Sequence, residues 1–202
     1  KGDGAYAISA GVGVVPIGRH IDDACVRPGD RIVVSGPLGD HGATVMAARH
    51  GMAGEALVSD AAPLTSLIAA VFAGGVTPHS MHDPTRGGLA TTLNEVAGRA
   101  GVAIEVEEAR VPIRESVTSV CDLLGLDPLY LACEGRVIFV VAPEDEARLL
   151  NILSDHPHGQ GAATVGRVLE PRGQVAPVWL QTEFGGSRPL DLLTGMNLPR
   201  IC

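Results

Sequence analysis

The most restrictive feature of this sequence is a pair of short apolar runs, RIVVSG at residues 31–36 and RVIFVVAP at residues 136–143. Residues of these types favour β-strands, and a strand without polar alternation has to be buried. The second run is the most strand-like segment of the chain. The two runs therefore predict buried strands within a sheet.

The other segments alternate between helix and strand signals, but not strictly. Apolar periodicity and Gly or Pro boundaries predict helices, with Asp40 as the N-cap of the first and Gly51 as its stop. Strand signals lie between them. This mixture favours an α+β fold with a mixed β-sheet covered by helices over a Rossmann fold. The expected helices are 37–51, 62–75, 89–101, 112–125 and 143–156, and the further strands are 5–16, 78–82, 102–108, 163–170 and 174–182.

Charge and cysteine usage exclude several classes of protein. The net charge is −8, which argues against a nucleic-acid partner. We find no apolar run of 18 residues and no signal peptide, so we expect a cytoplasmic protein without a membrane partner. The four cysteines contain no C-x-x-C pair, which argues against a zinc ribbon. Cys121 and Cys133 lie in apolar segments and are interpreted as small buried residues.

The segment MHDPTRGGLATTLNEVA, residues 81–97, is the strongest candidate for chemistry. Arg86, Gly87 and Gly88 lead into a helix N-terminus, where free N–H groups attract anions. A carboxylate such as Asp83 can hold Mg²⁺ against phosphates at such a loop. The alternative is that Asp83 or Thr85 only caps the helix. Spacing alone does not separate these two interpretations.

Two further segments are weaker candidates. In SGPLGDHGATVM, a capped helix with a partly exposed His41 explains the pattern better than a nucleotide or metal contact does. In LACEGRVIFVV, Glu134 precedes a buried strand and could serve as a base. Spacing alone favours the alternative, in which Glu134 is a turn residue paired with Arg136. His82 is of interest only because it adjoins Asp83.

The C-terminal residues 183–202 have little periodicity and predict a mobile tail after an α+β domain at 19–182. The tail ends in Cys202, which has no packing context. About 14 extended residues span up to ~45 Å, so the thiol could be loaded at one site and used at another. For a lone terminal cysteine, a frayed end without function is the more usual explanation.

The MHDPTRGGLATTLNEVA segment together with the terminal PRIC resembles the HypE family of hydrogenase maturation factors, and the resemblance covers essentially the whole chain. This family is related to aminoimidazole ribonucleotide synthetase and selenophosphate synthetase. The resemblance implies the C-terminal domain of that superfamily, an α+β fold that is partly ferredoxin-like. It also implies that residues 1–18 are the last strand and connector of an N-terminal domain preceding this chain.

The resemblance implies a chemistry as well. The terminal cysteine receives a carbamoyl group from the carbamoyltransferase HypF, and an ATP-dependent dehydration converts this S-carboxamide to a thiocyanate. The cyanide then passes to iron on the HypC–HypD complex for [NiFe]-hydrogenase. The implied site residues are Cys202 as the thiol, Glu134 as the proton acceptor, Asp83 beside Mg²⁺, and Arg86, Gly87 and Gly88 near the ATP phosphates.

The resemblance further implies a homodimer formed largely by the N-terminal domain, which also supplies much of the ATP site. We therefore expect this chain alone to bind ATP poorly and to be inactive. Two alternatives stay open. One is another ATP-dependent member of the superfamily, although DPTRGG with a terminal cysteine argues against it. The other is a non-enzymatic domain whose tail docks a partner.

Overall fold

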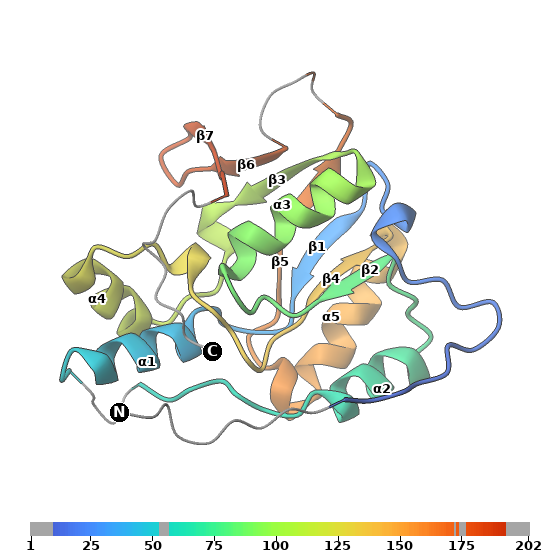
Figure 1. The fold of residues 1–202 in the computed structure, drawn as a ribbon. Helices are drawn as coiled ribbons and strands as arrows, with labels where there is room; N and C mark the ends of the chain where they lie inside the picture. The colour runs from blue at the N-terminus through green and yellow to red at the C-terminus, as the bar shows by residue number, and fades with distance from the viewer. Residues whose placement is uncertain (1–9, 53–56, 172, 174–176, 193–202) are drawn as a thin grey trace.

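A seven-stranded mixed sheet forms the centre of the protein (Figure 1). The structure is a computed structural model and describes residues 10–52, 57–171, 173 and 177–192. The strand order is β2-β4-β1-β5-β3-β6-β7, and neighbours are antiparallel except for the parallel β3–β6 pair. The strands are β1 Arg31–Val34, β2 Ser80–His82, β3 Ala103–Glu107, β4 Ile138–Val141, β5 Ala163–Leu169, β6 Val178–Gln181 and β7 Ser187–Pro189.

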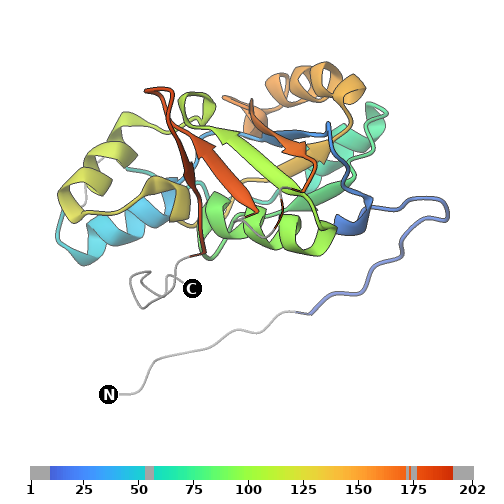
Figure 2. The ribbon, with the colours of Figure 1, turned by 90° about the horizontal axis from the view of Figure 1, so that it is seen from above.

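Helices lie on both faces of this sheet (Figure 2). They are α1 Asp40–Arg49, α2 Thr65–Ala73, α3 Gly88–Ala100, α4 Glu115–Leu124 and α5 Glu146–Ser154. Short 3₁₀ turns lie between the longer elements: η1 Asp23–Cys25, η2 Glu108–Arg110, η3 Pro128–Tyr130, η4 Pro143–Asp145 and η5 Pro157–Gly159. The predicted α+β fold with a mixed, helix-covered sheet is confirmed.

The apolar runs that predicted buried strands form β1 and β4, which pair with each other. Ile32 and Val34 face the core cluster beneath α3, whereas Val33 faces the cluster formed with α2 and α5. All three side chains are fully buried. A strand covered on both faces cannot alternate polar and apolar residues, which is why these runs are continuous.

The helix α3 buries the face that its sequence predicts. Leu89, Leu93, Val96 and Ala97 are all buried and pack on the sheet. On the opposite face, α2 and α5 cover β1 and β4 through residues that include Leu67, Val71, Leu149 and Leu153. The helices α2 and α5 do not extend over β3, where the charged Glu105 and Glu107 alternate with core residues.

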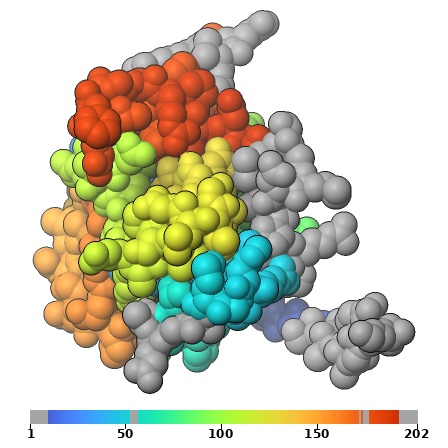
Figure 3. Space-filling model, turned by 90° about the vertical axis from the view of Figure 1, so that its left-hand side faces the viewer, coloured from blue at the N-terminus to red at the C-terminus, as the bar shows by residue number. Residues whose placement is uncertain are grey.

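A third, smaller layer lies beside the sheet, where α1 packs against α4. Its buried residues include Ala43, Ala47, Val117 and Cys121. Figure 3 shows α1 in cyan next to α4 in yellow-green, with the β6–β7 segment above them. This layer holds α1 in place, and α1 begins at one of the segments that we selected as candidates for chemistry.

The predicted strand at residues 5–16 is wrong for its described part, residues 10–16, which contain no strand. Val12 and Val14 are 104% and 93% exposed, so β-prone residues alone did not form a strand. A strand needs a neighbour to satisfy its backbone groups, and no described segment pairs with this one. Residues 1–9 lie outside the described part of the chain.

The predicted mobile tail from residue 183 is wrong for residues 187–189. Ser187–Pro189 form β7, which pairs with β6, and Leu190 is fully buried. The Leu190 N–H donates to the Val178 carbonyl at 2.9 Å. Pairing to the exposed edge of β6 therefore orders a segment of low strand propensity. Residues 193–202 lie outside the described part, so a mobile tail there stays a prediction.

Candidate functional site

Three loops that the sequence selected as candidates lie against one another. They are residues 35–42 after β1, residues 83–88 before α3, and residues 131–136 before β4. The Cys133 N–H donates to the Pro84 carbonyl at 2.9 Å, which joins the second loop to the third. Asp83 and Glu134 are the residues next to these two partners, so the fold brings their backbones together.

The first loop is joined to the third through its glycines. The Gly42 N–H donates to the Ala132 carbonyl at 3.0 Å, and the Gly39 N–H donates to Cys133 Sγ at 3.1 Å. A Cβ on Gly42 would come within 3.0 Å of the Ala132 nitrogen. Gly39, with φ of 84°, is the N-cap of α1. The predicted cap at Asp40 is therefore wrong by one residue, because Asp40 is the first residue of the helix.

Backbone conformation and close packing both favour glycine at the start of α3. Gly87 and Gly88 have φ of 81° and 59°, in the left-handed region that favours glycine. A Cβ on Gly88 would lie 2.6 Å from the Leu131 carbonyl oxygen and 2.7 Å from that of Leu129. The missing side chain thus lets the loop pack directly on residues 129–131.

The start of α3 lacks the cap that the alternative interpretation required. Its N-cap is Gly87, with no hydrogen bond from a side chain, so neither Asp83 nor Thr85 caps the helix. The side chains of Asp83 and Arg86 are exposed on the same loop. An exposed carboxylate and guanidinium beside an uncapped helix N-terminus can contact a phosphate ligand that carries a cation.

Glu134 is half-buried in the bend that precedes β4. The alternative interpretation paired it with Arg136, but the ion pairs of Arg136 go to other residues. Its Nη2 lies 3.7 Å from Asp40 Oδ2, and its Nε lies 3.8 Å from Asp60 Oδ2. Arg136 also donates from Nε to the Pro37 carbonyl at 2.8 Å. The carboxylate of Glu134 is therefore not used to neutralise Arg136.

Asp60 is the residue of this region that sequence reasoning missed. Its side chain is fully buried, and Oδ1 accepts a 3.0 Å hydrogen bond from the Glu134 N–H. Oδ2 forms no hydrogen bond with any described residue. A Cβ on Gly135 would overlap the Asp60 carbonyl oxygen, so the two segments are in direct contact. No spacing pattern marks Asp60, because its partners are distant in sequence.

Burial and charge set the protonation behaviour around the three loops. Burial raises the pKa of Asp40, although the nearby Arg114 and Arg136 oppose this change. Arg114 Nη1 donates to Asp40 Oδ2 at 2.7 Å. Burial also raises the pKa of the Cys133 thiol to about 12. Cys133 is therefore a protonated structural thiol, as its apolar sequence context predicted.

His82 has a structural partner on the other side of β2. Its Nε2 lies 2.7 Å from Asp23 Oδ1, which also accepts a 2.6 Å hydrogen bond from Ser80 Oγ. Arg99 Nη1 donates to Asp23 Oδ2 at 3.1 Å. Burial works against ionisation of Asp23, but these hydrogen bonds together lower its pKa. Asp23 thus connects η1 to β2 and α3, and its partner His82 is not a member of the candidate site.

The structure therefore brings together the loops of Asp83, Arg86, Gly87, Gly88 and Glu134. Cys202 lies outside the described residues, so its position relative to these loops stays a prediction. No group of three or more metal-ligating side chains occurs within the described ranges. No helix among the described elements is long and apolar enough to cross a bilayer.

Comparison with known proteins identifies the class to which this mixed sheet and its loops belong. The chain belongs to the family described as AIR synthase related protein, C-terminal domain, which matches residues 27–178. The chain is 46% identical to the carbamoyl dehydratase HypE of Azotobacter vinelandii over 203 aligned residues. That alignment covers 100% of this chain and 59% of the relative, so the chain spans little more than half the length of the relatives it matches.

Solved structures agree with this relationship. The crystal structure of Escherichia coli HypE superposes with a TM-score of 0.87 at 38% identity, covering 94% of this chain and 58% of that one. A HypE crystallised in complex with ATP gives 0.84 at 41% identity, covering 90% and 55%. HypE in a HypE–HypF complex gives 0.77 at 35% identity, covering 86% and 56%. The resemblance inferred from the sequence motifs is confirmed.

Proposed function

We propose that the full-length protein containing this chain is an ATP-dependent carbamoyl dehydratase of hydrogenase maturation. The observation that carries the proposal is the assembly of three loops, 35–42, 83–88 and 131–136, at one end of strands β1, β2 and β4. The 46% identity to a carbamoyl dehydratase over the whole chain supports the same conclusion. The fold alone would not, since related folds carry different activities.

The proposed reaction begins with the Cys202 thiol, whose S–H bond is replaced by a bond from sulfur to a carbamoyl carbon. ATP then transfers its terminal phosphoryl group to the carboxamide oxygen, which turns that oxygen into a leaving group. The C–O bond breaks and phosphate departs, while the nitrogen loses two protons as C≡N forms. The products are a thiocyanate on Cys202, ADP and phosphate.

Glu134 is the proposed acceptor for a proton from the carboxamide nitrogen. Its backbone is fixed by hydrogen bonding to Asp60, and its half-buried side chain is not paired with Arg136. A carboxylate held in this way can contribute as a general base when substrate is within hydrogen-bonding reach. The C-terminal segment of the chain would bring the carboxamide on Cys202 to this position.

Asp83, Arg86, Gly87 and Gly88 are the proposed contacts for ATP and Mg²⁺. Mg²⁺ is usually held by one or two carboxylates together with substrate phosphates and water. The exposed Asp83 carboxylate fits this requirement as one ligand, and the exposed Arg86 fits the phosphate charge. When bound, Mg²⁺ would neutralise charge on the transferring phosphoryl group.

The partners follow from the proposed reaction. HypF would supply the carbamoyl group, and the solved HypE–HypF complex of a similar protein supports this choice. The HypC–HypD complex would receive the cyanide for the iron of [NiFe]-hydrogenase, in the cytoplasm. We also propose a homodimer for the full-length protein. Because the chain spans 59% of its relative, we expect the remaining region to hold further ATP ligands and this chain alone to be inactive.

The test is to incubate the full-length protein with HypF, carbamoyl phosphate and ATP, and to follow its intact mass. We expect the addition of one carbamoyl group, followed by the loss of one water, with both changes mapped to Cys202. Cys202→Ala is the control and should remain unmodified. The absence of an adduct, or an adduct that survives Cys202→Ala, would contradict the proposal.

A further inference from the structure

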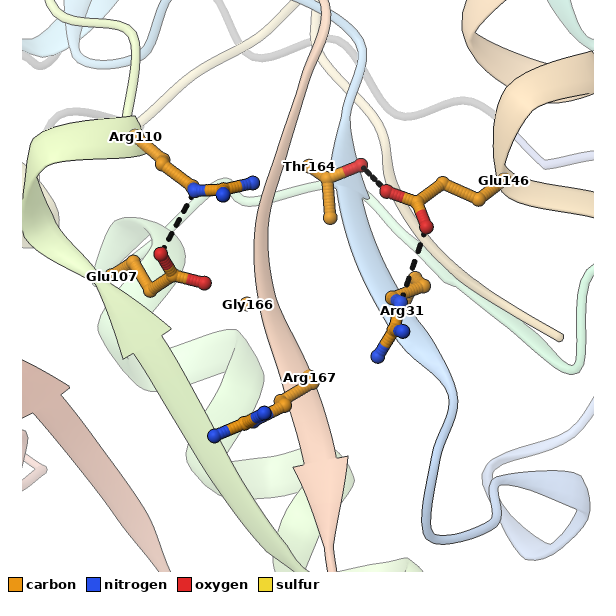
Figure 4. Close-up of a pocket in the computed structure, with 7 residues that line it drawn as sticks. All are labelled: Arg31, Glu107, Arg110, Glu146, Thr164, Gly166 and Arg167. Carbon is orange, nitrogen blue, oxygen red and sulfur yellow. Dashed lines mark hydrogen bonds and ion pairs between the residues drawn. The ribbon is translucent and has the colours of Figure 1, made fainter. Parts of the chain in front are cut away.

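The sheet has an open, charged region on the face that carries α2 and α5. These helices pack on β1 and β4 but not on β3. A cavity of about 300 Å³ lies between η2 and α5, above β5 (Figure 4). Its lining includes Arg31, Arg110, Arg167 and Thr164. None of the candidate ATP or dehydration residues lines this cavity.

A β-bulge in β5 brings two of the lining side chains to the same face. Val33 pairs with Thr164 and Ile32 with Gly166, which leaves Val165 as the extra residue. Val165 and the later Val168 both point into the core beneath α3. In a regular strand, residues three apart lie on opposite faces, but the bulge places Thr164 and Arg167 together. The local backbone is therefore arranged so that Arg167 is not directed into the core.

Arg31 and Arg110, on opposite sides of this cavity, are each paired with a carboxylate. Arg31 Nε lies 3.1 Å from Glu146 Oε2, and Thr164 donates to the other oxygen of that carboxylate at 2.6 Å. On the other side, Arg110 Nε lies 2.8 Å from Glu107 Oε2. A guanidinium has five N–H donors, so pairing through Nε orients the group and leaves Nη donors for another acceptor. In Arg31, one of these donors is already used, because Nη1 donates to the Gly29 carbonyl at 3.4 Å.

Among the arginines of the cavity, Arg110 has the most N–H groups without an acceptor among the described residues. Its Nη groups form no hydrogen bond with any described residue, and Figure 4 shows its guanidinium extending from η2 toward β5. Arg167 Nε and Nη2 both donate to Glu105 Oε1, at 3.0 and 2.7 Å, and its Nη1 has no recorded partner among the described residues. A guanidinium group held in a fixed orientation can donate two parallel hydrogen bonds to the oxygens of a phosphate or similar oxyanion.

We propose that this cavity binds a phosphate group, either as free phosphate or at the end of a small phosphate monoester. Arg110, Arg167 and Arg31 supply the donors, and Thr164 is fixed at the base of the cavity through Glu146. A cation is disfavoured, because three guanidinium groups line the cavity. The glutamates balance the arginine charge, so binding depends on directed hydrogen bonds and is weak.

The site is distinct from the proposed ATP site. Arg31 is the first residue of β1, whereas the 35–42 loop of the candidate site follows the last residue of that strand. The proposal is therefore independent of the proposed dehydratase activity. Either can fail without affecting the other.

The test is calorimetric titration of the full-length protein with inorganic phosphate and, separately, with glycerol 3-phosphate. A non-hydrolysable ATP analogue saturates the nucleotide site throughout, and chloride at equal ionic strength is the blank. Arg110→Ala removes the free donors of a residue that is 58% exposed, so the fold should persist. Arg188→Ala, on β7 and 46% exposed, is the matched control.

We expect saturable binding that Arg110→Ala weakens by about tenfold or more, the effect of losing charge-assisted hydrogen bonds. Arg188→Ala should bind like the parent protein. Tighter binding of glycerol 3-phosphate than of inorganic phosphate would identify a monoester as the natural ligand, and the reverse would identify free phosphate. Heat no greater than that of the chloride blank, or equal affinity in Arg110→Ala, would overturn the proposal.

Discussion

The backbone N–H of Glu134 donates a 3.0 Å hydrogen bond to Oδ1 of the buried Asp60. The two residues lie 74 positions apart in sequence, so this bond joins the segment before α2 to the segment before β4. Arg136 faces the other oxygen of Asp60 and also approaches Asp40. A buried ion cluster thus fixes the backbone from which the proposed base projects.

The first prediction concerns the stability supplied by Asp60. Asp60→Ala should lower the free energy of unfolding by about 1–3 kcal/mol, because it leaves the Glu134 N–H without its acceptor and removes a carboxylate that faces the buried Arg136. Urea denaturation of both proteins measures the difference. Asp122→Ala, at an exposed position of α4, is the control and should change stability by no more than ~0.5 kcal/mol. Equal stabilities for the Asp60→Ala and Asp122→Ala variants would show that the Asp60 bond adds nothing.

The second prediction separates packing from backbone strain at the start of α3. Gly88 and Gly101 have φ of 59° and 68°, so alanine is strained at both, by about 1–2 kcal/mol. A Cβ at Gly101 meets nothing within 4 Å, whereas at Gly88 it meets the Leu129 and Leu131 carbonyls. Gly88→Ala should therefore cost a further ~1–3 kcal/mol in chemical denaturation. The same loss for both variants would mean that the loop moves away without cost.

The third prediction concerns thiol reactivity. Burial raises the pKa of Cys133 to about 12 and that of Cys121 to about 11, so neither forms thiolate near neutral pH. Iodoacetamide at pH 8 should leave both unmodified in the folded protein and should label Cys202. Peptide mass mapping reads out each site, and denatured protein provides full labelling as the reference. Rapid native labelling of Cys133 would contradict its buried position.

The fourth prediction concerns acid stability around Asp23. Burial works against ionisation of this carboxyl, but hydrogen bonds from Ser80, His82 and Arg99 lower its pKa below the ordinary value. A depressed folded pKa stabilises the protein above the unfolded pKa, and this stability is lost as pH falls through the folded value. The relevant window is thus the range below about pH 4.

Ser80→Ala removes one of these hydrogen bonds and should move the pKa of Asp23 back toward its ordinary value. The variant should be less stable than the parent at pH 7, and the difference should shrink below about pH 4. Thermal unfolding at both pH values measures it. A difference that is independent of pH would show that Ser80 contributes through packing alone.

The sequence predicted the parts of the fold that depend on local pattern. Continuous apolar runs marked β1 and β4, and the apolar stripe of α3 marked its buried face. It did not predict β7, because Ser187–Pro189 become a strand only through pairing with β6. It wrongly predicted a strand at residues 10–16, where propensity is high but no described partner is present.

The candidate site could be predicted only as separate motifs. The glycines and charges of residues 83–88 and the acidic Glu134 were visible in the sequence, but their contact through Pro84 and Cys133 depends on the fold. Asp60 had no recognisable signal, because its role comes from burial and from partners in the distant 131–136 loop. Buried ionic clusters of this kind are defined by three-dimensional proximity and not by spacing.

The rate of water loss from the carbamoylated protein tests the proposed role of Glu134 most directly. The full-length protein is first carbamoylated by HypF and separated from it, and its intact mass is followed after ATP is added. Glu134→Gln should carry the carbamoyl group normally but lose water ~100-fold more slowly or worse, the range expected for a missing general base. Glu115→Gln, on the exposed first turn of α4, should convert at the parent rate. Conversion of Glu134→Gln at the parent rate would contradict a proton-transfer role for this residue.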